Sequence, residues 1–259
     1  MLGDDLTAVD GAAGSWIAAG LGGEAGTVAR FVPAVFDAYA RIFHRACDDD
    51  GRPVSWAEVA RRLGRNAHPE MQWHQLVGSS DPFNLSGSKW HGSNPRVGGL
   101  EIDELDRLSD LLADDTSDPE RCFFGLCGIQ GWVEGALSPG ESRQRRLELP
   151  KDRDHVVFSG PLSAVDQIGD ARGAGRGEPS TPIPPDPFWR EAPNLIWPAD
   201  RSWLVVSEVD FDSTLLGGTR GLVDALIRSG DLETYEVEPS TSLVAFSDKL
   251  NPVAEREHR

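Results

Sequence analysis

The stretch from Trp203 to Val209 constrains the fold more than any other part of the sequence. Apolar side chains occupy consecutive positions from Trp203 to Val206, so they fall on both alternating sets of positions. Because successive side chains of a strand point to opposite faces, this pattern indicates a strand that is buried on both sides. We therefore expect Trp203–Val209 to be the central strand of a covered sheet.

Three segments of the N-terminal half have the apolar spacing that is typical of amphipathic helices. The first is expected to run from Val28 to about Cys47, with a stripe formed by Phe31, Val32, Val35, Phe36, Tyr39, Ile42 and Phe43. The second runs from Trp56 to Leu63, between an N-terminal cap at Ser55 and a C-terminal cap at Gly64. The third is marked by Leu100, Leu105, Leu108, Leu111 and Leu112.

The C-terminal half changes to short apolar runs that are bounded by turn residues and predict strands. The expected strands are Cys122–Cys127, His155–Phe158 and Thr234–Val237, and Thr219 is the expected cap of a helix that ends before Gly230. These patterns predict an α+β fold, in which a mainly helical N-terminal half packs on a mixed β-sheet formed by the C-terminal half.

One domain is expected over residues 28–252. Residues 1–27 contain four acidic residues, no Lys or Arg and few apolar positions, so we expect a flexible acidic arm there. Residues 169–187 are rich in Gly, Pro, Ser and Arg and are expected to form a mobile loop, while 253–259 form a tail. The alternative is that the 169–187 loop links two domains.

The charge of the chain limits its expected partners and its location. A formal net charge of −17 at pH 7 repels phosphate backbones, which disfavours nucleic acid and favours a basic partner protein. No apolar run approaches the roughly 18 residues of a membrane span, and the acidic N-terminus does not resemble a secretory signal. Cys47, Cys122 and Cys127 have no disulfide or zinc-ribbon spacing. We expect a cytoplasmic protein without membrane contact.

The segment Asp210-Phe211-Asp212-Ser213-Thr214 resembles motif one, D-x-D-x-T, of the haloacid dehalogenase-like phosphohydrolases. The resemblance implies a nucleophile at Asp210, a general acid and base at Asp212, and Mg²⁺ beside them. Strand alternation would also place Glu208 on the same face, where the three carboxylates would bind a hard cation. Too few residues follow Asp212 to complete that family's fold. The sequence therefore favours the alternative of an acidic turn whose side chains cap backbone N–H groups.

Three histidines, His68, His74 and His91, are candidate metal ligands. His68 and His74 lie six residues apart, and His91 follows in a loop, so no pair has the i, i+4 spacing of a helical zinc motif. We expect them to be surface or capping residues. No glycine-rich phosphate motif follows a strand, so the sequence predicts no nucleotide cofactor.

The helix at Trp56–Leu63 also resembles the first helix of a helix-turn-helix. Arg61, Arg62 and Arg65 would contact phosphates in that case. The following stretch, His68 to Val77, is short and contains a Trp where small packing residues are expected, so ordinary helix packing is the favoured interpretation.

Three stretches, over 32–44, 68–74 and 197–214, resemble a family of actinobacterial proteins of unassigned function, over about residues 28–252. The resemblance implies no activity, but it implies that both halves belong to one unit. Eight tryptophans, an acidic charge and the lack of a complete catalytic set favour a non-catalytic interaction or immunity-type protein. The alternatives are a divalent-metal-dependent, phosphoesterase-like hydrolase using Asp210, Asp212 and Glu208, and a helix-turn-helix DNA-binding protein.

Overall fold

A computed structural model describes residues 5–85, 87–127, 146–150, 153–168 and 192–253. They form a nine-stranded sheet of order β1-β7-β5-β8-β9-β10-β2-β11, in which β6 also pairs with β7. The strands are β1 Thr7–Val9, β2 Ala38–Phe43, β5 Cys122–Cys127, β6 Arg146–Leu149, β7 Arg153–Gly160, β8 Leu195–Pro198, β9 Leu204–Val206, β10 Ser213–Gly218 and β11 Thr234–Val237.

Helices and a small hairpin complete the fold. The α-helices are α1 Ser15–Gly20, α2 Trp56–Leu63, α3 Trp73–Leu76, α4 Ile102–Asp114 and α7 Arg220–Ser229. The 3-10 helices are η1 Gly11–Gly14, η2 Val28–Arg30 and η3 Leu162–Gln167, and the hairpin pairs β3 Ala46–Cys47 with β4 Pro53–Val54. None of the helices among the described residues has both the length and the apolar composition that crossing a membrane requires.

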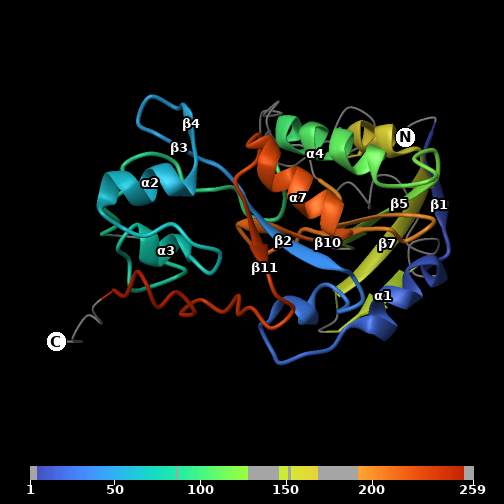
Figure 1. Cartoon of the computed structure of the whole chain (residues 1–259), viewed down its shortest axis with the longest axis horizontal. Coiled ribbons are helices and arrows are strands. Elements are labelled where there is room, and N and C mark those ends of the chain that lie inside the picture. The colour runs from blue at the N-terminus through green and yellow to red at the C-terminus, as the bar shows by residue number, and fades with distance from the viewer. Residues whose placement is uncertain (1–4, 86, 128–145, 151–152, 169–191, 254–259) are drawn as a thin grey trace, which may run out of the picture.

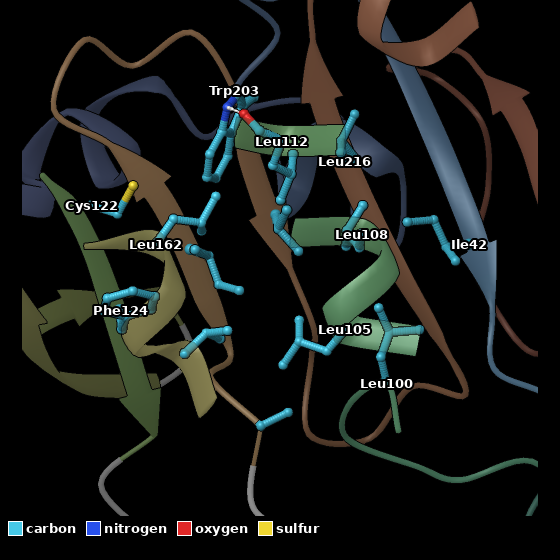
Figure 2. Close-up of a cluster of buried hydrophobic side chains, with 14 of the residues drawn as sticks. Ile42, Leu100, Leu105, Leu108, Leu112, Cys122, Phe124, Leu162, Trp203 and Leu216 are labelled. Atoms are coloured by element: carbon cyan, nitrogen blue, oxygen red, sulfur yellow. Dashed lines mark hydrogen bonds between the residues drawn. The ribbon is translucent and has the colours of Figure 1, made fainter. Parts of the chain in front are cut away.

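Helices α4 and α7 cover one face of the sheet (Figure 1). The leucine stripe of α4 packs against side chains from β2, β5, β9 and β10, and Figure 2 shows this cluster. The indole N–H of Trp203 enters the same core and donates a 3.1 Å hydrogen bond to the carbonyl of Leu112 at the end of α4. That bond satisfies the one polar group of a side chain that is otherwise buried in hydrocarbon.

The N-terminal segment covers the opposite face. Ile17 of α1 and the η2 region pack on Leu204 and Leu215 of the central strands. Gly217 allows this close packing, because a Cβ at that position would lie 2.4 Å from a ring carbon of Phe36. Residues 7–20, within the expected arm, thus form β1, η1 and α1 and contribute to the core.

A small lobe formed by β3, β4, α2, α3 and the loop that follows lies beyond the β2 and β11 side of the sheet (Figure 1). Its core contains Trp56, Trp73 and Met71, all buried. The expected caps hold α2 in place: the Ser55 hydroxyl accepts from the Glu58 N–H, and Gly64 adopts φ 65° at the C-terminus. The C-terminal segment runs along this lobe.

The expected mainly helical N-terminal half is wrong. Within the helix expected from Val28 to Cys47, the structure has the short 3-10 helix η2, strand β2 and strand β3. All six residues of β2 are buried, with Ala40 and Ile42 on the helix-covered face and Tyr39 on the other. A strand buried on both faces has apolar residues at most of its positions, and such a run also contains the apolar spacing of a helix.

The expected mixed sheet is also wrong, because every strand pair that the structure describes is antiparallel. The strand expected over Trp203–Val209 is shorter than predicted: β9 spans Leu204–Val206, and residues 207–212 form the loop to β10. Its burial on both faces is confirmed, since Leu204 and Val205 belong to opposite cores. The expected loop at 169–187 and the end of the expected tail lie outside the described residues.

Candidate functional site

A groove of about 690 Å³ lies between the small lobe and the β9–β10 loop. Its walls come from segments far apart in the sequence: β2, α3, the loop at 82–97, the β9–β10 loop and the segment at 243–245. It is more spacious than three other cavities among the described residues, and it contains two of the three carboxylates singled out from the sequence. We refer to it as the lobe groove.

Arg41 of β2 lies in the lobe groove and is buried. Its Nε donates to the Ser213 hydroxyl at 2.9 Å, and one terminal nitrogen donates to the carbonyls of Pro69 and Met71, each at 3.1 Å. The other terminal nitrogen lies 3.9 Å from Asp212, which is an ion pair without a short hydrogen bond. The guanidinium also lies 4.4 Å from the centre of the Phe43 ring. Arg41 therefore links strand β10 of the sheet to the backbone of the small lobe.

The charges of this pair are only partly compensated. Burial lowers the pKa of Arg41 to about 10, although Asp212 opposes that shift, so the guanidinium remains charged at pH 7. Burial likewise raises the pKa of Asp212, against the effect of Arg41. A buried cation with one carboxylate at 3.9 Å retains some attraction for negatively polarised groups that enter the groove.

His74 supplies a polar atom that lacks a partner. The residue is 5% exposed and lines the lobe groove, but its Nε2 makes no hydrogen bond to the described residues. The exposed ring of Phe246 packs edge-on against the imidazole, with centroids 5.3 Å apart. Burial lowers the pKa of His74, which keeps the ring neutral. Unsatisfied buried polar atoms are uncommon in native proteins, but protein covers this one, so a bound group would reach it only if a neighbouring side chain moved.

The mouth of the groove is apolar and exposed. The Asp81 carboxylate accepts from the backbone N–H groups of Phe83 and Asn84, and this turn holds the Phe83 side chain out in solvent, 96% exposed. Val97 on the same wall and Phe246 beside it are also exposed. Clustered exposed apolar side chains at a concave surface are a feature of binding sites rather than of ordinary protein surface.

The three predicted carboxylates do not meet at one point. Asp212 pairs with Arg41 in the lobe groove, whereas Glu208 and Asp210 both pair with Arg153, at 3.3 and 2.5 Å. Glu208 lines a different cavity from Asp210 and Asp212. All three belong to a loop between antiparallel strands, because the strand has ended by Val206, so strand alternation does not align them.

No group of three or more His, Cys, Asp or Glu side chains within the described ranges is arranged to hold a metal ion. His68 Nδ1 accepts from the Glu70 N–H, so Nε2 carries the proton and donates to Asp248 at 2.8 Å. His74 is buried, and His91 is exposed. The histidines considered as metal ligands thus lie in different environments.

The helix-turn-helix alternative has a first helix, α2, but the described residues that follow it offer no exposed second helix. Helix α3 has four residues, Trp73 to Leu76, and all of them are buried. A recognition helix must present side chains to a DNA groove, so this geometry does not favour DNA binding.

Sequence reasoning missed Arg41, Phe83 and Phe246. A lone arginine inside the apolar run Ala38–Phe43 was a usable signal, because an isolated charge in a buried element requires partners. Comparison of the chain with family models, curated proteins and solved structures found no match.

Proposed function

We propose that this protein is a non-catalytic interaction protein that binds a segment of a partner protein in the lobe groove. The observation that carries the proposal is Phe83, an almost fully exposed aromatic side chain held at the mouth of a large groove. Aromatic residues are enriched among those that dominate binding energy at protein interfaces. In the absence of a partner, the exposed Phe83 ring buries almost no surface and so contributes little to the stability of the fold.

The net charge of the chain favours a partner segment with a basic residue beside an apolar one. Asp210 on the wall of the groove is 71% exposed, although it is paired with Arg153, and Asp212 is partly exposed. The net charge of −17 would steer a basic partner toward the chain. A groove that joins apolar walls to an acidic side suits an immunity-type role, in which an acidic protein neutralises a basic one.

Affinity capture with matched variants tests the proposal. The immobilised wild-type protein, Phe83→Asp and Val35→Asp would each be exposed to an extract of the source cells. Val35 is also an exposed apolar residue, but it does not line the groove. We expect the same specific protein on wild type and Val35→Asp, its loss on Phe83→Asp, and weaker retention at high salt. Thermal melting should show that both variants are folded, because both side chains are exposed.

Two results would overturn the proposal. One is retention of the same proteins by all three forms, which would mean that the groove is not used. The other is the absence of any protein specific to the wild type at low salt. The hydrolase alternative receives less support from the geometry, since all three of its carboxylates are paired with arginines.

A further inference from the structure

A second cavity lies on the face of the sheet opposite α4 and α7. It is bounded by the ends of β5, β6, β7, β8 and β9 and by the η2 region, and it shares no lining residue with the lobe groove. Its volume of about 40 Å³ corresponds to roughly three water-sized groups. We refer to it as the sheet cavity.

His155 provides a hydrogen-bond acceptor in the sheet cavity. The residue is 5% exposed, and its Nδ1 lies 2.9 Å from the carbonyl oxygen of Arg153. A carbonyl can only accept, so Nδ1 carries the proton of the neutral ring and Nε2 has the lone pair. Burial lowers the pKa of His155 to about 4, which keeps the ring in this form at pH 7. Within the described residues, Nε2 has no hydrogen-bond partner.

Two arginines lie on the same walls. Arg153 is neutralised by Glu208 and Asp210. Arg30, by contrast, makes no ion pair with any described carboxylate, although the chain has a large excess of acidic residues. Glu208 also lines the cavity, but Arg153 and the Val209 N–H hold its carboxylate. Among the described lining residues, Arg30 is therefore the charged side chain with which an anionic group could pair.

The rest of the lining decides the size and polarity of a ligand. Phe31, Leu195 and Val206 supply apolar contacts, and both polar atoms of the Asn194 side chain are already bonded to backbone groups. The thiol of Cys127 lies on the same wall, and Cys127 is the direct antiparallel partner of His155. A complementary molecule thus needs one anionic group, one hydrogen-bond donor and a short apolar part.

We propose that the sheet cavity binds a short-chain hydroxy acid of about three carbons, since three waters occupy roughly 90 Å³ in the liquid. Its carboxylate pairs with Arg30, its hydroxyl donates to Nε2 of His155, and its alkyl group packs on Leu195 and Val206. This site is separate from the lobe groove, so a test of ligand binding here does not depend on the proposed partner binding.

Titration calorimetry with sodium L-lactate and D-lactate tests the proposal, with sodium chloride as the salt control. Propionate lacks the hydroxyl and 2-propanol lacks the carboxylate, so each removes one proposed contact. We expect saturable binding of at least one lactate enantiomer. Leaving the neutral His155 acceptor without a donor should weaken binding by about fivefold or more, so propionate should bind that much more weakly, and 2-propanol, which lacks the carboxylate, should show no binding.

Arg30→Gln should lower lactate affinity by a similar factor, whereas Arg228→Gln should not change it. Arg228 is an exposed arginine on α7 that also lacks a carboxylate partner among the described residues, and it lies far from the cavity. Bound lactate should also slow alkylation of Cys127 in the wild-type protein, with Cys47 as the internal control. That measurement needs no variant, so it remains informative if Arg30→Gln fails to fold.

Three results would overturn the proposal. Absence of binding by both lactate enantiomers excludes the ligand class. Equal affinities for lactate and propionate exclude the contact with His155. Unchanged lactate affinity in Arg30→Gln, or an unprotected Cys127 under saturating lactate, excludes the assigned position.

Discussion

Asp248 is the residue whose removal should test the reasoning about this fold most directly. It is 1% exposed and joins the C-terminal segment to the small lobe. One carboxylate oxygen accepts from His68 Nε2 at 2.8 Å, from the Leu250 N–H at 3.0 Å and from the Asn251 N–H at 2.8 Å. The other accepts from the Asn251 side chain at 2.8 Å and from the Gln72 N–H at 3.4 Å. Burial alone would raise the pKa of Asp248, but the hydrogen bonds from Asn251 and His68 outweigh it and lower the pKa.

The expected loss of stability in Asp248→Ala follows from the hydrogen-bond donors that the substitution leaves without an acceptor. Each buried donor without an acceptor costs about 1–3 kcal/mol, and loss of one partner from a buried charged network typically costs about 3–5 kcal/mol. The Asn251 side chain and the Gln72 N–H are both buried, so they cannot turn to solvent. We therefore expect the free energy of unfolding to fall by about 3–5 kcal/mol. Asp248→Asn retains one acceptor oxygen and should cost less.

Urea unfolding followed by tryptophan fluorescence measures this effect, because Trp56 and Trp73 lie in the lobe core. Asp50→Ala is the matched control: Asp50 is an exposed acid whose partner among the described residues is Arg52, also exposed, and its loss should not measurably change stability. If Asp248→Ala unfolds within about 1 kcal/mol of wild type, the C-terminal segment does not stabilise the lobe and the reasoning is wrong.

Three further predictions concern pH and metal. Burial raises the pKa of Glu233 to about 7, despite hydrogen bonds from the α2 N-terminus. The stabilisation of wild type relative to Glu233→Gln should therefore be greatest below about pH 4.5 and should be lost as pH rises through 7. A difference in melting temperature that does not vary with pH would contradict this. Burial lowers the pKa of both His44 and His155 to about 4, so their contributions are present above about pH 6.5 and are lost as pH falls toward 4. The difference in melting temperature between wild type and His155→Gln should therefore shrink as pH falls from 6.5 toward 4, and a difference that does not vary with pH would refute the assignment. The melting temperature should be the same with Mg²⁺ and with chelator, because the Asp210 carboxylate is already paired with Arg153. A rise with Mg²⁺ that Asp210→Asn abolishes would support the hydrolase hypothesis.

The carboxylates show why the sequence alone could not predict the arrangement of the site. Their spacing predicted a common face only if the strand continued through Asp212, but the chain leaves the sheet after Val206. Which arginine each acid meets depends on residues far away in the sequence, Arg41 for one and Arg153 for the others. Local spacing contains no information about those partners.

Short-range patterns determined the elements whose stabilising contacts are local. Helix α2 begins after Ser55 and ends at Gly64, and helix α7 begins after Thr219 and ends at Gly230, as the caps predicted. Strands β5 and β11 match the apolar runs from which they were predicted, and β9 is buried on both faces. Capping bonds and burial on alternating faces depend on neighbours within a few residues, so the sequence by itself records them.

Tertiary structure decided the conformation of residues 38–43 and the composition of both cavities. The run Ala38–Phe43 has apolar residues at helical spacing, but β10 and β11 pair with it from either side, and both come from the last fifth of the chain. Backbone hydrogen bonds to two strands and burial on two faces outweigh a weak intrinsic preference for helix. The lobe groove combines five separate segments in the same way, and residues such as Arg41 and Phe83 acquire a shared role only when these long-range pairings bring them together.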